Sequence, residues 1–321
     1  MGKWMNRQSI VTLLGVLLIY GIVQGSIFMG VLPPFVALTL IQICIYIILS
    51  CSLNLINGIT GQFSIGHAGF MAIGAYLAAI VIVKFHGPLI LALLIGALVS
   101  AVAGFLIGLP TLRLNGDYLA IATLGFGEIV RIIFLNTEYV SGASGFSVPK
   151  TINWTWAFWL TAFSILMIRN FINSTHGRAC ISIRENEIAA DAMGINTTKY
   201  KIIAFTIGAF FAGLAGGIYA NYMYIIQPMT FSFLKSFDIL VMVVLGGLGS
   251  LTGSIVGAIV MTVASAALAG LPEWRLVITA VLLIAMMIFR PAGIMGTKEF
   301  TLSFLGKKGD KNAASKNRKS L

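Results

Sequence analysis

Residues 35–56 read FVALTLIQICIYIILSCSLNLI, a stretch of 22 residues without a charged side chain. An α-helix needs about 20 mostly apolar residues to cross about 30 Å of hydrocarbon, so this stretch predicts a membrane-spanning helix. Nine similar runs accompany it, at 9–30, 67–84, 88–109, 117–135, 154–172, 201–224, 238–254, 255–271 and 274–290. The sequence therefore predicts an all-α integral membrane protein, a polytopic helical bundle of about ten transmembrane helices.

The overall composition of the 321 residues agrees with a membrane protein. Hydrophobic residues make up 58% of the chain and charged residues 10%, whereas soluble domains have roughly 45–50% and 25%. Because charged side chains cover the surface of a soluble protein, this composition excludes a soluble globular chain. The three scattered cysteines, Cys44, Cys51 and Cys180, have neither metal-ligand spacing nor the density of a disulfide scaffold.

The lysines and arginines predict which side of the membrane each loop occupies. With a cytoplasmic N-terminus and ten spans, sixteen of them fall inside, four fall outside, and Arg131 lies within a span. The inner set is Lys3, Arg7, Arg113, Arg169, Arg178, Arg184, Lys199, Lys201, Arg290 and seven residues of the tail 298–321, and the outer set is Lys84, Lys150, Lys235 and Arg275. Positive residues stay cytoplasmic, so both termini are expected in the cytoplasm. The chain thus divides into a transmembrane domain at 1–297 and a basic cytoplasmic tail at 298–321, which lacks the interleaved aromatics of a nucleic-acid site.

One polar loop stands out between the apolar runs. Residues 173–200, NSTHGRACISIRENEIAADAMGINTTKY, are charged, favour helix, and fall on the cytoplasmic side. Two interpretations fit this pattern: a docking site for a cytoplasmic partner, or a long connector.

Two glycine-rich joins interrupt the apolar pattern. They are NGITGQFSIGHAGF at 57–70 and GGLGSLTGSIVGAIV at 246–260. Broken backbone inside a membrane is tolerated only where protein or a water-filled cavity satisfies it, and transporters place such breaks beside their pathways. The alternative is close helix packing through small residues, which we prefer for the glycines of 208–217. The candidate pathway residues in the joins are Gly58, Gly61, Gln62, Ser64, His67, Gly246 and Gly247.

Ionisable residues inside spans need an interior position, because facing lipid is costly. Glu128 and Arg131 are three residues apart, so they share a helix face and can pair. Asp117 and Asp238 stand at the start of predicted spans, where an acid can cap a helix. A place along a pathway is the other interpretation for Glu128, Arg131 and Asp238. We expect His67 to form hydrogen bonds rather than to bind a metal.

A search for catalytic chemistry returns nothing. The chain has no G-x-x-x-x-G-K-[ST] phosphate loop, no H-E-x-x-H, no C-x-x-C and no G-x-S-x-G motif. The sequence therefore predicts no catalytic residue, no metal site, no cofactor and no ATPase activity of its own.

Five ordered blocks between about residues 50 and 296 carry a family resemblance. They are NLINGITGQFSIGHAGFMAIGAYLAA (54–79), TLRLNGDYLAIATLGFGEIVR (111–131), GRACISIRENEIAADAMGI (177–195), VVLGGLGSLTGSIVGA (243–258) and FRPAGIMG (289–296). Together they resemble the permease family of branched-chain amino acid ABC transporters, and the second and third blocks look like its M-type subunit. The resemblance implies a type II importer-like fold in a bacterial cytoplasmic membrane. It also implies a companion H-type permease, two cytoplasmic ATP-binding subunits and an extracytoplasmic solute-binding protein.

The resemblance gives the loop 173–200 a role, which is docking into the ATPase. Importer permeases share an E-A-A-x-x-x-G pattern there, to which Ala189, Ala190 and Gly194 correspond. Ile188 holds the place of the glutamate and Glu187 precedes it, so the docking acid is left open. The candidate coupling residues are Arg178, Arg184, Glu187, Ala189, Ala190 and Gly194.

Other functions compete with this interpretation. Permeases for urea or short-chain amides resemble the same family. An ion-coupled secondary carrier would need an ion site, for which Glu128 or Asp238 is the candidate. An intramembrane enzyme is disfavoured because no acid, base, nucleophile or metal-ligand constellation is present.

Overall fold

A computed structural model describes the backbone of residues 7–111, 116–270 and parts of 277–296. Predictions for Lys3, Arg113, Arg275, the tail 298–321 and most of the span 274–290 lie outside these residues.

The described chain is almost entirely helical. The helices are α1 (Arg7–Phe28), α2 (Pro34–Asn54), η1 (Leu55–Ile59, a π-helix), α3 (His67–Val83), α4 (Leu89–Thr111), α5 (Asp117–Asn136), η2 (Glu138–Val140), η3 (Gly142–Ser144), α6 (Trp154–Asn173), α7 (Thr175–Glu185), α8 (Glu187–Ala192), α9 (Thr197–Ala220), η4 (Pro228–Phe231), α10 (Phe233–Gly246) and α11 (Leu251–Ala267). Strand β1 (Phe146–Ser147) pairs antiparallel with β2 (Ile225–Ile226). Within the described ranges, five segments are long and apolar enough to cross a membrane: Pro34–Ile59, Leu89–Thr111, Asp117–Asn136, Trp154–Asn173 and Thr197–Ala220.

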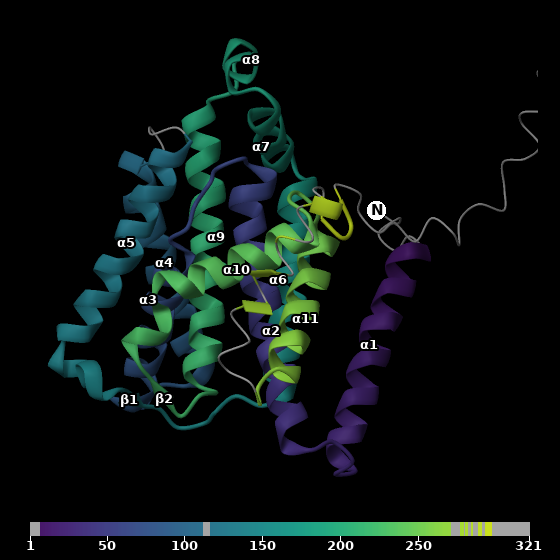
Figure 1. The fold of residues 1–321 in the computed structure, drawn as a ribbon, viewed down its shortest axis with the longest axis vertical. Coiled ribbons are helices and arrows are strands. Elements are labelled where there is room, and N and C mark those ends of the chain that lie inside the picture. Colours follow the sequence, from purple (N-terminus) through teal and green to yellow (C-terminus); the bar gives the residue numbers. More distant parts are fainter. Residues whose placement is uncertain are drawn as a thin grey trace, which may run out of the picture.

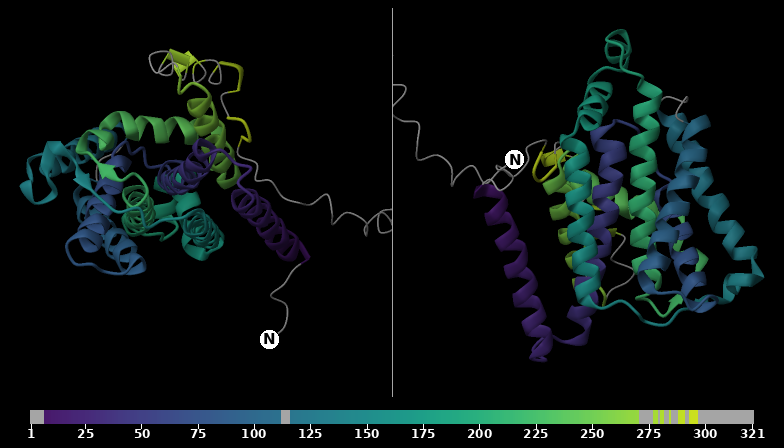
Figure 2. Two further views of the ribbon diagram at one scale, coloured as in Figure 1. Left: turned by 90° about the horizontal axis from the view of Figure 1, so that it is seen from below. Right: turned by 180° about the vertical axis from the view of Figure 1, so that it is seen from behind.

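The elements form a bundle with two different ends (Figures 1 and 2). Helices α7 and α8 project from one end, and β1 and β2 lie at the opposite end. Helix α1 stands beside the bundle, whereas α2 and α9 are central and carry long buried faces. The polar loop 173–200 thus lies at the opposite end of the bundle from β1 and β2, as expected of a spanning protein.

Glycines let three of the central helices approach closely. A Cβ at Gly96 of α4 would lie 2.7 Å from the carbonyl oxygen of Gly74 in α3, and one at Gly74 would overlap the backbone of Gly213 in α9. Small residues bring helix backbones together in membranes. The packing interpretation of 208–217 is therefore confirmed.

The predicted boundary between spans 238–254 and 255–271 is wrong. The break falls at 247–250, where Gly247 and Gly249 have φ values of +117° and +87°. A left-handed backbone ends a helix, and hydropathy does not register it. Helix α10 therefore has 14 residues and rises only about 21 Å. It crosses the bundle obliquely in Figure 1, and buried Phe231 of η4 precedes it.

Neither predicted acidic cap is formed. Helix α10 begins at Phe233, so Asp238 lies inside it, in the second turn. Asp117 is the first residue of α5, and Gly116 occupies the cap position.

Candidate functional site

The join 57–70 dips back into the bundle. Helix α2 continues as the π-helix η1 to Ile59, and α3 begins at His67. His67 Nε2 lies 2.8 Å from Oγ of Ser52, seven residues before the end of η1, so α3 starts about 10 Å inside that end. His67 forms a hydrogen bond, as predicted.

Side chains from three elements hold this turn. Asn57 accepts a bond from the Ser64 backbone nitrogen and donates one to its carbonyl oxygen, both at 3.2 Å. Thr123 of α5 accepts from the nitrogen of Ile65 at 3.1 Å, and Ser236 of α10 accepts from that of Ala68 at 3.0 Å. The broken backbone is thus satisfied by protein, as membrane depth requires.

Three candidate pathway residues of this join carry buried polar atoms that have no partner among the described residues. Both amide atoms of Gln62, Oγ of Ser64 and Nδ1 of His67 are buried without a hydrogen-bond partner among the described residues. Buried polar groups are nearly always paired, and those that are not need a water or polar solute. Four of the eight side-chain atoms that are buried without a partner among the described residues thus lie in this join.

The two glycine-rich joins meet, which the sequence did not predict. Asn54 Oδ1 accepts from the Gly249 nitrogen at 2.9 Å, and Asn54 Nδ2 donates to the Ser250 carbonyl at 3.0 Å. A Cβ at Gly58 would overlap the nitrogen of Gly249, so the backbones touch. Sequence reasoning missed Asn54, whose only signal is an amide in the last turn of an apolar run.

The block 289–296 of the family resemblance packs against the same region. The nitrogens of Ile294 and Met295 donate to the carbonyls of Leu245 and Gly246, at 2.9 and 3.2 Å. These carbonyls end α10 and have no partner within the helix. The segment 293–296 thus caps the last carbonyls of α10 at the break between α10 and α11.

The loop 173–200 folds as two short helices with side-chain caps. Ser174 caps α7, Asn186 caps α8 and Asn196 caps α9, each accepting from a backbone nitrogen three residues on. Helix α7 packs on η1 and α9 through an apolar cluster made of Leu55, Ile59, Cys180 and Ala204. Burial raises the pKa of the Cys180 thiol to about 11, so the thiol is neutral at physiological pH.

Helix α8 is held at both ends. Glu187 Oε1 lies 2.5 Å from Nζ of Lys201 in α9, a side chain that is only 11% exposed. Gly194 has φ +83°, and a Cβ added there would meet no atom beyond its chain neighbours within 4 Å, so the turn depends on backbone conformation rather than on space. Ala190 is buried against the bundle and Ala189 is exposed.

The tip of this loop presents two large apolar side chains to solvent. Ile188 and Met193 are each 83% exposed. Apolar anchors on a polar, projecting element are typical of a protein-binding surface. Sequence reasoning named Ile188 only as a departure from the family pattern and missed Met193.

The two predicted coupling arginines differ in their contacts. Arg184 donates to the carbonyl of Gly58 at 3.0 Å, whereas Arg178 donates to that of Asn173 at 3.3 Å, within its own loop. Only Arg184 of these two joins the loop to a glycine-rich join.

The predicted charged candidates lie elsewhere: Glu128 and Arg131 where α5 meets the start of α10, and Asp238 beside Lys235 of α10. Arg131 Nε pairs with Glu128 Oε2 at 2.7 Å, which confirms the predicted pair, and Glu128 Oε1 accepts from the Phe233 nitrogen at 2.9 Å. Asp238 lies near Lys235, whose ammonium donates to the Tyr46 hydroxyl. None of the described contacts of Glu128 and Arg131 reaches the join 57–70.

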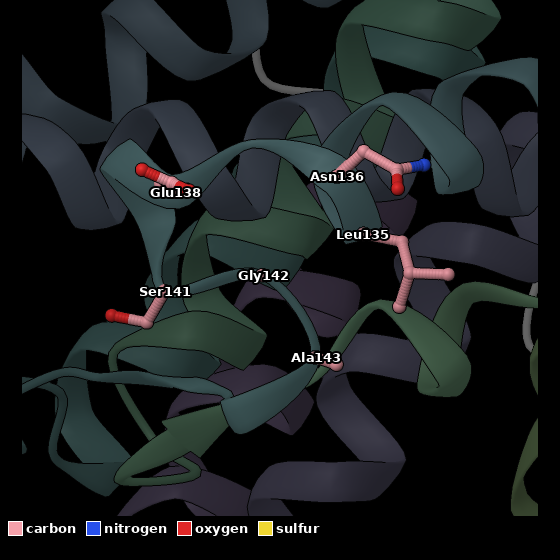
Figure 3. Close-up of a pocket in the computed structure, with 6 residues that line it drawn as sticks. All are labelled: Leu135, Asn136, Glu138, Ser141, Gly142 and Ala143. Atoms are coloured by element: carbon pink, nitrogen blue, oxygen red, sulfur yellow. The ribbon is translucent and has the colours of Figure 1, made fainter.

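A shallow hollow at the loop after α5 belongs to neither feature (Figure 3). Leu135, Asn136, Glu138, Ser141, Gly142 and Ala143 line it. Within the described ranges, no group of three His, Cys, Asp or Glu side chains is placed to hold a metal.

Comparison with known proteins identifies the family. The family model described as branched-chain amino acid transport system / permease component matches residues 35–287. The permease LivM of Salmonella typhimurium is 38% identical, over 78% of this chain and 68% of its own, and Escherichia coli LivM is 37% identical over the same shares. LivH of Salmonella typhimurium is 27% identical, over 79% of this chain and 92% of its own.

No solved structure matches the chain significantly. The helical bundle and the residues matched by the family model show a multi-pass membrane permease. The family match over 35–287, together with higher identity to LivM than to LivH, shows that the chain belongs to the branched-chain amino acid transport permease family, as an M-type member.

Proposed function

We propose that this chain is the M-type membrane subunit of an ATP-driven importer for branched-chain amino acids. It forms half of the translocation pathway and couples it to ATPase subunits. The observation that carries the proposal is the exposed apolar tip of the loop 173–200, joined through α7 to the two glycine-rich joins. The partners are an H-type permease, two cytoplasmic ATP-binding subunits and an extracytoplasmic solute-binding protein.

The arrangement proposed is ten transmembrane segments within 1–297, in a bacterial cytoplasmic membrane. Both termini and the basic tail 298–321 are cytoplasmic. Helices α7 and α8 then lie in the cytoplasm, and β1 and β2 lie outside. The different ends of the bundle and the distribution of basic residues support this orientation.

The roles within the coupling loop divide by exposure. Ile188, Ala189 and Met193 contact the ATPase, since they are exposed. Glu187, Ala190 and Gly194 hold α8 in place, because Glu187 pairs with Lys201 and Ala190 is buried. This division gives Glu187 a structural task in place of the docking role that the family pattern suggests.

The pathway is proposed to pass the join 57–70. Its unpartnered polar atoms on Gln62, Ser64 and His67 support this position, since a polar solute needs polar contacts inside an apolar bundle. Gly58, Gly61, Gly246 and Gly247 shape the backbone around it. Glu128 and Arg131 lie where α5 meets the start of α10, and we assign this face to the contact with the companion permease. Asp238 lies beside Lys235, which contacts Tyr46 of α2, and it stays a candidate pathway residue.

The comparisons do not favour the alternatives. The most similar relatives carry branched-chain amino acid names rather than urea or amide names. A carrier with an ion site at Glu128 is also disfavoured, because Arg131 and the Phe233 nitrogen already occupy that carboxylate.

Docking can be tested with charged substitutions at the tip. We expect Ile188→Asp and Met193→Asp each to abolish co-purification of the ATP-binding subunits, because an acid replaces an apolar anchor. Ile225→Asp, at an exposed apolar position in β2 at the opposite end, is the control. Normal co-purification of both tip variants would contradict the docking surface.

A further inference from the structure

We propose that Arg184 is a positioning residue that ties the coupling loop to both glycine-rich joins, so that movement of α7 displaces the two joins together. This inference rests on the proposed function. It names the contact through which motion of the coupling loop reaches the joins.

The guanidinium of Arg184 lies where the three segments meet. Its Nη1 donates to the Gly58 carbonyl at 3.0 Å. A Cβ at Gly249 would lie 2.7 Å from the same Nη1, and a Cβ at Gly61 would lie 3.3 Å from Cα of Arg184. One side chain of α7 therefore touches the end of η1, the turn after it and the break between α10 and α11.

The guanidinium is also fixed from the side of its own helix. Nε and Nη2 both donate to Oε1 of Glu185, at 3.1 and 2.5 Å. The Arg184 side chain is only 30% exposed, and a charged donor strengthens its bond to a carbonyl. Because the group is held at both sides, α7 cannot shift without pulling on Gly58 or breaking this bond.

The segment that receives the pull is built to deform. Gly58 belongs to a π-helix, a form that is rare and appears mostly at functional sites. Gly61 and Gly249 have φ values of +74° and +87°, so the backbone on both sides of the contact turns sharply. The apolar cluster beneath α7 holds the helices together, but apolar contacts do not fix the direction of a movement. The Arg184–Gly58 hydrogen bond has a defined direction, so it can carry a movement of α7 to η1.

Asn54 makes the two joins respond as one. Its amide bonds both Gly249 and Ser250 from the last turn of α2. A pull on Gly58 therefore moves the α10–α11 break as well, and the polar lining at 62–67 follows directly along the chain. Coupling between the loop and the pathway requires a part that both contact and that can move, and the two bonded joins form such a part.

The test compares transport with ATP hydrolysis in the complete complex. Arg184→Ala, Arg184→Lys and the wild-type chain are reconstituted in proteoliposomes with the companion permease, ATP-binding subunits and binding protein. Arg169→Ala, which removes an exposed arginine of α6, is the control. Leucine uptake and ATP hydrolysis are measured in the same vesicles, and complex yield and thermal stability are recorded.

We expect Arg184→Ala to raise the ATP hydrolysed per leucine by roughly tenfold while hydrolysis itself stays within about twofold. Arg184→Lys, which keeps a charged donor but loses the planar fork of the guanidinium, should recover part of the coupling, and Arg169→Ala should match wild type. A normal ratio in Arg184→Ala, or an equal fall in uptake and hydrolysis, overturns the inference and leaves the proposed function standing. Absence of ATP-dependent uptake by the wild-type complex overturns both.

Discussion

Asn54 has the most demanding position among the polar residues of the bundle. It is fully buried, and its amide bonds a backbone nitrogen and a backbone carbonyl of a segment almost 200 positions later in the chain. Buried backbone groups that lose a partner keep their full desolvation penalty. The junction therefore depends on this amide for two hydrogen bonds between α2 and the α10–α11 break.

Asn54→Ala should lower the free energy of unfolding by about 2–4 kcal/mol, because it leaves the Gly249 nitrogen without the Asn54 oxygen, removes one of the bonds to the Ser250 carbonyl and leaves a small cavity. Asn173→Ala, at an exposed position at the end of α6, is the control and should have little effect. Thermal unfolding of the purified chain in detergent measures the difference. Equal midpoints for the two variants would show that the joins are held by something else.

Several residue roles could be predicted from sequence and others could not. The Glu128–Arg131 pair follows from helical spacing, and the turn at Gly194 follows from its residue type. The exposure of Met193 and the partners of Asn54 depend on which segments meet in three dimensions. A single sequence carries no signal for such contacts.

At the scale of elements, hydropathy predicted the starts of several helices but misplaced the break between α10 and α11. Helices α3, α5 and α6 begin at the predicted residues, His67, Asp117 and Trp154. Helix α9 begins at Thr197 rather than 201, because Asn196 caps it. The α10–α11 break was misplaced because hydropathy does not locate it within the glycine-rich join 246–260, where the left-handed conformations of Gly247 and Gly249 end the helix.

Helix α8 should loosen when its ion pair is removed. Glu187→Gln leaves the poorly exposed ammonium of Lys201 without its acid, and an unpaired buried charge is costly. We expect amide exchange in α8 to speed up by roughly tenfold, about 1.4 kcal/mol of opening free energy, with α9 beyond its first turn unchanged.

Asp191→Asn, a change at an exposed acid of the same helix, is the control for this experiment. Glu187→Gln combined with Lys201→Met should restore slow exchange, since it removes the stranded charge. Equal exchange in Glu187→Gln and Asp191→Asn would refute the structural task assigned to Glu187.

At the scale of the whole molecule, the proposed orientation places the two ends of the bundle on opposite sides of the membrane. A cysteine replacing Asp191 in α8 should react with an impermeant maleimide only from the cytoplasmic side. A cysteine replacing exposed Ser147 in β1 should react only from the outside. Right-side-out and inside-out vesicles separate the two cases, and labelling of both positions from one side would reject the arrangement.

We propose that this chain forms the pathway and that its partner subunits supply the energy from ATP. The most direct test of this proposal is leucine uptake into proteoliposomes containing this chain alone or with the H-type permease, ATP-binding subunits and binding protein. We expect no accumulation by the lone chain and ATP-dependent accumulation by the full set. Accumulation by the lone chain that an ionophore abolishes would contradict the proposal.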